Sequence, residues 1–239
     1  MAKTDEIIAA QRRAGTQVAV ISQHRFDPAT EVAVSAIGNG ELGRLTSGIA
    51  SIDWWRGQTY YDSGDWRGTW ELDGGGALMN QGVHTVDLLV ATMGRPVEVF
   101  AYTGTLAHER IEVEDVAVGV VRFENGAIGV LHATTAAYPG LSARLQVHGD
   151  RGSVAIDNDK LTFIHLTPSG GSAEERAYGQ AGTAINQIAD YPEASGAAAQ
   201  TAGSNPGQLA LDAHRRQYEN FLAALAGQET IRVDLETNR

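Results

Sequence analysis

The chain has 239 residues, of which 43% are hydrophobic, and a formal net charge of −11. This length allows a buried core in one large or two small domains, and an acidic chain without a Lys/Arg cluster argues against binding to nucleic acid or to an anionic membrane surface. The sequence has no cysteine, no apolar run of about 18 residues and no apolar signal core after MAKTDEIIAA, so we expect a globular, cytoplasmic protein without disulfide or thiolate chemistry.

The N-terminal region combines a predicted helix with an apolar segment. Residues 4–14 have helical spacing and are followed by Gly15, after which comes QVAVISQHRF at 17–26. Such a continuous apolar run is typical of a strand that is buried on both faces of a parallel sheet. A lone helix and strand cannot form that sheet.

The glycines of GNGELG are the next feature. Gly38, Gly40 and Gly43 have the spacing of a dinucleotide-binding turn, which must leave a strand and open a helix. Here a predicted helix that begins near Pro28 precedes the glycines, and a predicted strand at 45–52 follows them. The order is reversed, so we predict a loop that ends a helix.

The stretch 53–94 concentrates aromatic and arginine residues and ends in a predicted helix over 74–93. At about 100° per residue, Asn80, His84 and Asp87 share its polar side. The predicted apolar arc consists of Leu78, Met79, Val83, Val86, Leu89, Val90 and Met93. Asn80 and His84 are four residues apart and can touch the same small molecule. The alternative is the exposed face of a surface helix, but the preceding glycines and aromatic loop favour a pocket.

After Pro96 the apolar pattern changes to a period of two. It predicts an antiparallel meander, with a hairpin turn at 124–126. The predicted strands cover 97–105, 116–123, 127–136, 141–149 and 154–164. Because small and apolar residues occupy both faces of the second of these strands, we expect one sheet face to pack on helices and the other to form a sheet-to-sheet dimer.

The last part of the chain has two features. The segment 168–208 is rich in Gly, Ala and Ser, and predicts a long loop or flap. Residues 209–226 then predict an amphipathic helix that ends at Gly227. Its apolar side is predicted to include Leu211, His214, Tyr218, Phe221, Leu222 and Leu225, with His214 as a packed or capping residue.

Several segments together resemble the C-terminal part of the Gfo/Idh/MocA oxidoreductase family. They are QHRFDP, GELGR, WWRGQTYYDSGDWRGTW, GGGALMNQGVHTVDLL, VEDVAVGVVRFENGAIGVLHATTAAYPG, VHGDRGSVAID and AHRRQYENFLAAL. The resemblance implies an α+β fold with a large, mostly antiparallel sheet and helices on one face. It also implies that 1–26 is a remnant of a Rossmann dinucleotide-binding domain and that 27–239 is a substrate-binding and oligomerisation domain.

The family's catalytic pattern, Asp-x-x-x-His, aligns with Asn80 to His84. The resemblance implies that His84 is the acid/base that moves the hydroxyl proton, which an imidazole can do near neutral pH. Asn80 departs from the family's aspartate. An amide can orient a hydroxyl or an imidazole but cannot take up a proton. The family's glycine-rich cofactor fingerprint and its Glu-Lys-Pro segment, which supplies a catalytic lysine, have no counterpart in these residues.

The resemblance also assigns binding residues. The loop before the helix corresponds to the family's substrate pocket, which makes Arg56, Tyr60, Trp66 and Arg67 candidates for contacts with a sugar or polyol. On the residues alone, each of these fits equally well in a folded surface loop. Gln23 and Arg25 correspond to positions beside the nicotinamide, and so are candidate cofactor-binding residues.

We therefore expect a domain of an NAD- or NADP-dependent oxidoreductase that acts on a sugar, polyol or related hydroxy compound, with the isolated chain inactive and the parent a homo-oligomer. One alternative is a non-catalytic sugar-binding or dimerisation module. Another is a hydrolase that uses Asp62 and Asp65 as a carboxylate pair, although turns commonly contain aspartate. The seven histidines lack ligand-like spacing, so no metal site is expected.

Overall fold

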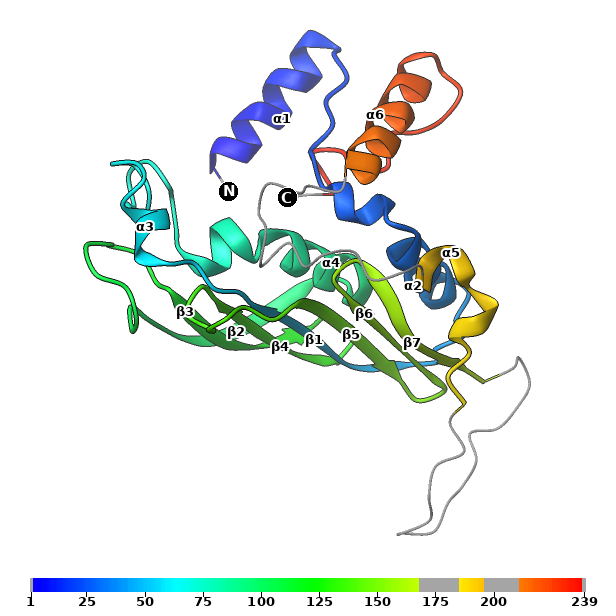
Figure 1. Cartoon of the computed structure of the whole chain (residues 1–239). Coiled ribbons are helices and arrows are strands. Elements are labelled where there is room, and N and C mark those ends of the chain that lie inside the picture. The colour runs from blue at the N-terminus through cyan, green and yellow to red at the C-terminus, as the bar shows by residue number, and fades with distance from the viewer. Residues whose placement is uncertain (1, 168–184, 196–210, 238–239) are drawn as a thin grey trace, which may run out of the picture. The chain divides into compact units, whose positions relative to one another are not determined.

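A computed structural model of the chain describes residues 2–167, 185–195 and 211–237. The chain forms two compact units: Met1–Asp27 with Ala210–Arg239, and Pro28–Leu209 (Figure 1). None of the helices in the described ranges has the length and apolar character needed to cross a membrane.

A seven-stranded sheet with the order β2-β3-β4-β1-β5-β6-β7 dominates the second unit. The strands are β1 (Leu45–Asp53), β2 (Pro96–Gly104), β3 (Val116–Phe123), β4 (Ile128–Thr134), β5 (Ala143–Gly149), β6 (Gly152–Asp157) and β7 (Lys160–Leu166). Only the β1–β4 pair is parallel, and all other neighbouring strands are antiparallel. The predicted α+β class with a mostly antiparallel sheet is confirmed.

Two details of the predicted meander are wrong. β1 is inserted between β4 and β5, so the later strands do not pair only with their neighbours in sequence. The single strand expected at 154–164 is the β6–β7 hairpin, which turns at Asn158 and Asp159 with φ of 46° and 63°. A two-residue turn of this hand requires positive φ at both positions, which Asn and Asp tolerate better than most residues.

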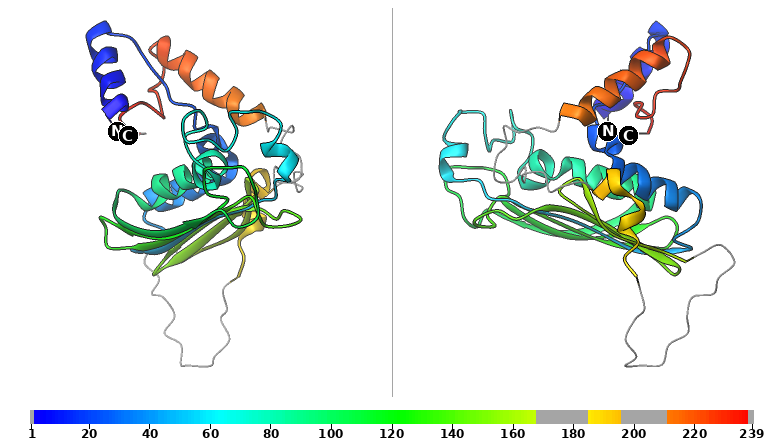
Figure 2. Two further views of the ribbon diagram at one scale, coloured as in Figure 1. Left: turned by 90° about the vertical axis from the view of Figure 1, so that its left-hand side faces the viewer. Right: turned by 45° about the vertical axis from the view of Figure 1, so that its right-hand side comes forward.

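Helices α2 (Pro28–Gly38) and α4 (Val83–Met93) lie on one face of this sheet (Figure 2). The α4 helix can approach β1 closely because Gly48 has no side chain. A Cβ atom at Gly48 would lie 2.8 Å from the Leu89 side chain and 2.9 Å from that of Met93. Leu89 and Met93 are fully buried there, in the same core cluster as residues of α2, β5, β6 and β7. The loop predicted around Gly38–Gly43 does end α2 and lead into β1.

The helix predicted at 74–93 is interrupted. Residues 77–81 form a π-helical turn, η2 (Ala77–Gln81), in which the Gly82 N–H donates to the Ala77 carbonyl, five residues back. This wider turn shifts the phase of the residues before α4. The predicted apolar arc is therefore wrong at Met79 and Val83, which are 59% and 44% exposed. The buried side of α4 consists of Thr85, Leu88, Leu89, Thr92 and Met93.

The opposite face of the β2–β3–β4 half carries a group of exposed apolar side chains, here called the open-face patch. Its members are Phe100, Tyr102, Val118, Val120, Ile128 and Val130. The strand register places them side by side: Phe100 pairs with Val120, and Val120 pairs with Val130. Phe100 and Tyr102 also make an edge-to-face contact, with ring centroids 5.1 Å apart.

The first unit contains α1 (Ala2–Ala14), the 3-10 helix η1 (Gln23–Phe26) and α6 (Leu211–Leu225). The strand predicted after α1 is wrong, because residues 16–22 have no regular secondary structure. The Val20 N–H donates to the Val233 carbonyl, and the Val20 carbonyl accepts from Gln217. A strand of a parallel sheet needs neighbouring strands, and the described residues of this unit supply none.

The apolar side predicted for α6 faces outward. Leu211, Tyr218, Leu222 and Leu225 are all more than half exposed. The buried side instead contains Ala213, Gln217, Asn220 and Ala224. His214 is half-buried, as a packed residue would be.

Most of the loop predicted at 168–208 falls on 168–184 and 196–208, outside the described residues. The described part, 185–195, forms the short helices η3 (Ile188–Asp190) and α5 (Pro192–Ser195).

Replacing Leu89 by Ala should open a cavity between α4 and β1 and lower the free energy of unfolding by about 2–5 kcal/mol. Val83→Ala, on the exposed side of the same helix, should change it by no more than about 0.5 kcal/mol. Urea unfolding followed by circular dichroism measures both variants. Equal losses would contradict the assignment of the buried side of α4.

Candidate functional site

Four adjacent strands begin or end side by side at one end of the sheet. Asp53 at the end of β1 pairs with Thr134 at the end of β4, which pairs with Val116 at the start of β3, which pairs with Gly104 at the end of β2. The chain segments that leave these ends therefore start in one row. They carry most of the residues described below.

The segment after β1 builds a ladder of alternating rings and guanidinium groups, here called the ladder. The Arg56 guanidinium carbon lies 5.1 Å from the centre of the Trp54 ring and 5.6 Å from that of Tyr60. The Arg67 guanidinium carbon lies 4.3 Å from the centres of both Tyr60 and Trp66. The order is Trp54, Arg56, Tyr60, Arg67, Trp66. All four predicted substrate-binding residues are thus brought together, and Trp54 joins them.

Arg56 is the buried member of the ladder, with 6% of its surface exposed. Its guanidinium donates to the Gln81 side-chain oxygen at 2.8 Å and to the Trp55 carbonyl at 3.2 Å. Burial lowers the pKa of Arg56, against the opposing influence of Tyr60 and Tyr61. An arginine remains cationic even so. The ladder therefore holds a partly desolvated positive charge between two aromatic faces.

Gln81 connects the ladder to the helix that carries the predicted catalytic residues. Its amide oxygen accepts from Arg56 and its amide nitrogen donates to the Tyr60 hydroxyl at 3.3 Å. Sequence reasoning missed this residue, because nothing in its spacing distinguishes it from any other polar residue of the helix. Its position at the end of the π turn gives it both contacts.

Asn80 and His84 lie on either side of the junction between η2 and α4. The Asn80 amide donates to the Gly75 carbonyl at 2.7 Å and to the Asp73 carbonyl at 3.5 Å. It therefore ties η2 to the glycine loop before it. His84 lies in the first turn of α4 and is half-buried, so its imidazole is not sealed in the apolar interior.

Two of the three glycines before η2 have different reasons to be glycine. Gly74 has φ of +80° and open space around it. Gly76 approaches another backbone: a Cβ atom there would lie 1.9 Å from the Glu114 carbonyl oxygen. The Gly76 N–H also donates to the Glu114 carboxylate, so both the carbonyl and the carboxylate of Glu114 lie close to Gly76.

Asp115 and His108 form a buried pair that sequence reasoning also missed. Both side chains are almost fully buried, and His108 Nδ1 lies 2.9 Å from the Asp115 carboxylate. Burial by itself would raise the pKa of Asp115. Hydrogen bonds from the N–H groups of Leu106, Ala107 and His108 and from the His108 ring outweigh this, so the pKa lies below the ordinary aspartate value. The carboxylate is ionised at neutral pH.

The two predicted cofactor-binding residues belong to η1 in the first unit. Gln23 is 4% exposed, and its side-chain oxygen is buried without a hydrogen-bond partner among the described residues. Such an orphaned acceptor suits an N–H donor such as the carboxamide of a nicotinamide. The Arg25 carbonyl accepts from Arg232 at 3.3 Å.

Asp62 is not a suitable general acid for a hydrolase. The Asp62 carboxylate accepts from Gln58 and from the Arg110 guanidinium at 2.9 and 3.0 Å. These hydrogen bonds lower the pKa of Asp62. A general acid near neutral pH requires a raised pKa, so this pairing argues against the carboxylate-pair hypothesis.

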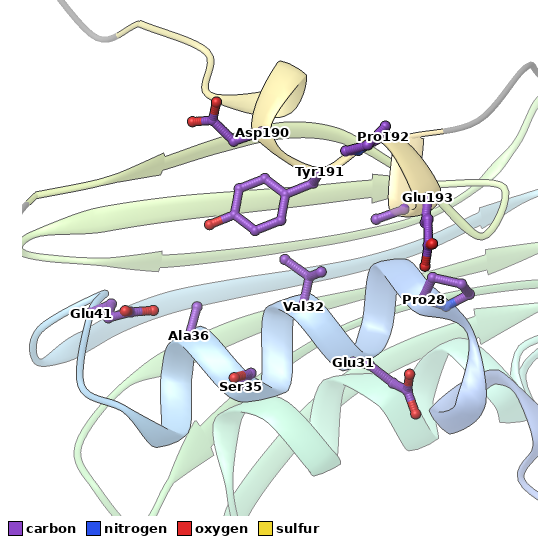
Figure 3. Close-up of a pocket in the computed structure, with 11 residues that line it drawn as sticks. Pro28, Glu31, Val32, Ser35, Ala36, Glu41, Asp190, Tyr191, Pro192 and Glu193 are labelled. Carbon is purple, nitrogen blue, oxygen red and sulfur yellow. The ribbon is translucent and has the colours of Figure 1, made fainter.

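A cavity of about 520 Å³ lies elsewhere in the second unit, between α2 and the segment 190–194. In Figure 3 the Tyr191 ring faces Val32 and Ala36 of α2. The other lining residues include the acidic side chains Glu31, Glu41, Asp190 and Glu193. No ladder residue lines this cavity, so the candidate site rests on the ladder and not on the cavity.

Comparison with known families and curated proteins gives a consistent result. A model of the GFO/IDH/MocA C-terminal domain matches residues 31–155. An uncharacterised oxidoreductase of Bacillus subtilis, YrbE, is 30% identical over 169 residues, which is 69% of this chain and 47% of that protein. Myo-inositol 2-dehydrogenase of Thermotoga maritima is 35% identical over 106 residues, or 43% of this chain and 32% of that protein. The chain thus spans half or less of the length of these relatives.

Solved structures also match. The WlbA dehydrogenase of Chromobacterium violaceum, in complex with NADH and UDP-GlcNAcA, has a TM-score of 0.75 and 27% identity. That match covers 98% of this chain and 60% of the dehydrogenase. A levoglucosan dehydrogenase in complex with NADH and levoglucosan has a TM-score of 0.69 and 20% identity, covering 91% of this chain and 59% of its own. The second likeness concerns the fold alone.

Gly76→Ala should lower the free energy of unfolding by about 2–4 kcal/mol, because the added methyl group meets a backbone carbonyl that cannot move aside and displaces the Glu114 contact. Gly74→Ala should cost only about 1 kcal/mol, from its left-handed backbone conformation. Chemical unfolding of the two variants makes the comparison. The close approach to Glu114 is refuted if Gly74→Ala is the more damaging change.

Proposed function

Because the chain belongs to the Gfo/Idh/MocA oxidoreductase family, we propose that it is the substrate-binding and oligomerisation part of an NAD(P)-dependent oxidoreductase. The proposed substrate is a sugar, a polyol or a related hydroxy compound. The observation that carries the proposal is the ladder, which assembles two cations and three aromatic rings beside the helix of Asn80 and His84.

The ladder fits the chemistry of polyhydroxylated molecules. The C–H face of a sugar ring stacks on Trp or Tyr, while guanidinium groups donate to hydroxyl, carboxylate or phosphate oxygens. Arg56 is fixed by Gln81 and by burial, so it can contact a substrate oxygen with little loss of side-chain entropy. Trp66 at the other end is 44% exposed and accessible to a ligand.

The relatives support the class of substrate. One relative is named for its action on myo-inositol, and one structure holds UDP-GlcNAcA with NADH. Both molecules contain a polyhydroxylated ring. Such rings are bound by stacking surfaces and by donors to hydroxyl groups, which the ladder provides.

His84 is the proposed acid/base. Its imidazole takes the proton of the reacting hydroxyl as the carbinol carbon is oxidised, and returns it in the reverse direction. Asn80 orients a group but cannot accept a proton. When bound, NAD(P) supplies the chemistry of hydride transfer, and Gln23 and Arg25 are the proposed residues on its side.

Residues 1–26 are proposed to be the remnant of a dinucleotide-binding domain, and they form one compact unit with α6. Its exposed apolar residues support this: Ile7, Ile21 and the outward side of α6 are surfaces that further structure would cover. The sequence contains no strand, glycine-rich turn and helix in the order that holds a pyrophosphate. We therefore propose that the 239-residue chain alone has no dehydrogenase activity.

A non-catalytic sugar-binding module is the second candidate. Asn80 favours it, because an amide stands where the family has an aspartate and is committed to the Gly75 and Asp73 carbonyls. Such a module keeps the ladder but does not need His84. The two candidates differ in whether His84 is needed, so a substitution of His84 separates them.

Arg56→Ala should weaken binding of the chain to whichever of myo-inositol, levoglucosan or UDP-GlcNAcA it binds by about tenfold or more, since it removes a buried charged donor. His84→Ala should leave that affinity nearly unchanged. In the full-length protein, His84→Ala should reduce NAD(P)-linked turnover by about 10²–10⁴-fold. Calorimetric titration and a nicotinamide absorbance assay give the two readouts.

Arg95→Ala, at an exposed arginine that pairs with Glu124, is the matched control for lost charge. Sugar binding that survives Arg56→Ala would remove the ladder from the proposal. Binding that depends on Arg56, together with turnover that ignores His84, would favour the non-catalytic module.

The open-face patch is the proposed oligomer interface. Six apolar side chains are aligned on adjacent strands there, which is the arrangement expected of a surface that packs against another protein. Val99 lies on β2, the edge strand that also carries Phe100 and Tyr102 of the patch. It pairs with the buried Val121, so its side chain is on the sheet face opposite to the patch. It is 64% exposed, and so provides a matched control.

Val120→Glu should convert a dimer into monomers, because it places a charge in the middle of the patch. Val99→Glu should leave the dimer intact. Light scattering at micromolar concentration reports the change, with the monomer at 25.4 kDa. A wild-type chain of monomeric mass would remove the proposed interface.

A further inference from the structure

Two adjacent acidic residues, Glu114 and Asp115, occupy the strand end where the candidate site begins. They directly precede β3, and their carboxylates make contacts with different segments. Within the described ranges, neither carboxylate pairs with a Lys or Arg side chain, and Asp115 pairs with His108. Both accept from backbone N–H groups. Those at Glu114 belong to Gly76 and Leu78, 38 and 36 residues away, and those at Asp115 belong to the nearby residues 106–108.

Glu114 holds the start of the catalytic helix. Its carboxylate accepts from the N–H groups of Gly76 and Leu78, both at 3.1 Å, and its carbonyl accepts from the Ala77 N–H at 2.8 Å. Three consecutive residues at the start of η2 are thus fixed to one residue that directly precedes β3. The backbone that leads to Asn80 and His84 has its origin there.

Asp115 holds the loop after β2. Its carboxylate accepts from the N–H groups of Leu106, Ala107 and His108, at 2.8–3.0 Å. It also accepts from His108 Nδ1. The imidazole is packed edge-on against Tyr61, with ring centroids 4.7 Å apart, and so has a fixed orientation.

His108 transmits this fixed orientation to Arg56. His108 Nε2 lies 2.6 Å from the Arg56 carbonyl oxygen. Both ring nitrogens thus lie within hydrogen-bond distance of an oxygen atom, one of the Asp115 carboxylate and one of the Arg56 carbonyl. The Asp115 carboxylate fixes the position of Nδ1, and Nε2 in turn fixes the position of the Arg56 carbonyl. The ring thereby couples the position of Arg56 to that of Asp115.

A second path leads from Asp115 to the same residue. The Arg56 N–H donates to the Thr135 carbonyl at 2.9 Å, and the Thr135 N–H donates to the Asp115 carbonyl at 2.9 Å. The Arg56 peptide groups are therefore held on both sides. Each path ends at Asp115.

We propose that Asp115 and His108 are positioning residues that set Arg56 of the ladder, and that Glu114 sets the helix of His84 from the next position in the chain. The two adjacent acids thereby fix the substrate-binding cation and the acid/base relative to one another. This inference rests on the proposed function, since it assigns Arg56 and His84 their roles. Neither Asp115, His108 nor Glu114 is a catalytic residue in this scheme.

The buried charge of Asp115 indicates that Asp115 and His108 position other groups and do more than fill the core. A well-packed apolar pair often stabilises a fold as much as a buried charged pair does, so stability alone does not explain a buried carboxylate that is held against an imidazole. Apolar contacts are non-directional, whereas five hydrogen bonds at Asp115 and His108 define distance and angle.

Two substitutions of His108 separate its two nitrogens. The amide nitrogen of His108→Asn can replace Nδ1 toward Asp115 but cannot reach Arg56. The longer His108→Gln places its nitrogen near the position of Nε2 and can still donate to the Arg56 carbonyl. Positioning therefore predicts weak sugar binding in His108→Asn and rescue in His108→Gln, at similar melting temperatures.

We expect the dissociation constant of the sugar or polyol that binds the wild-type chain to rise about tenfold in His108→Asn and no more than about threefold in His108→Gln. Hydrogen exchange, measured by NMR on the ligand-free chain, provides a second readout. The Arg56 amide should exchange faster in His108→Asn than in His108→Gln.

Glu114→Gln completes the test. It should speed amide exchange at Gly76 and Leu78 and leave exchange of the Arg56 amide unchanged. His108→Asn should speed exchange of the Arg56 amide and leave that of Gly76 and Leu78 unchanged. The inference would be overturned if the loss of sugar affinity in the two His108 variants simply matched their loss of melting temperature. An exchange rate of the Arg56 amide that is the same in both variants as in the wild type would also overturn it. Because exchange needs no ligand, a chain that binds no sugar refutes the proposed function without deciding the positioning role.

Discussion

The buried Asp115 carboxylate is the interaction on which the arrangement of the site depends. Its side chain is 0% exposed, yet its pKa is lowered, because the hydrogen bonds of Leu106, Ala107 and His108 to the ionised form outweigh the cost of burial. A folded pKa below the unfolded value stabilises the fold above about pH 4 and loses that effect as the pH falls through the folded pKa. His108 and Tyr61 are the titratable groups packed beside it. The carboxylate is thus charged throughout the neutral range.

The sheet makes this anchoring possible, because its register brings four strand ends into one row. The ladder leaves β1, the His108 loop leaves β2, and the two acids enter β3, so short segments are enough to join them. The helix that carries His84 is placed independently, by the packing of Leu89 and Met93 on Gly48. Apolar packing sets the distance of that helix from the sheet, and Glu114 sets where its first turn begins.

Much of the fold could be predicted from local patterns. The period of two predicted the bounds of β3, and the density of aromatic and arginine residues singled out the segment that forms the ladder, although the prediction was a pocket and not this stacked arrangement. The phase error in the η2–α4 helix has a local cause, the π turn, which a fixed 100° per residue cannot represent. His108 and Asp115 could not be found in this way, because most of their partners are backbone groups, and one of these, the Arg56 carbonyl, is 52 residues distant from His108. A periodicity argument detects which side chains are apolar, and carries no information on which carbonyl an imidazole meets.

The inverted α6 helix extends this lesson to the first unit. Its sequence has a regular apolar side, but the structure buries the opposite one, where Gln217 bonds to Ser22 and Val20 and Asn220 bonds to Thr230 and Arg232. These amides are hydrogen-bonded to backbone groups, and Asn220 also donates to the Glu229 carboxylate, so their burial leaves no amide unsatisfied. The apolar residues Leu211, Tyr218, Leu222 and Leu225 lie on the other side and are more than half exposed, so an apolar pattern alone does not identify the buried side of this helix.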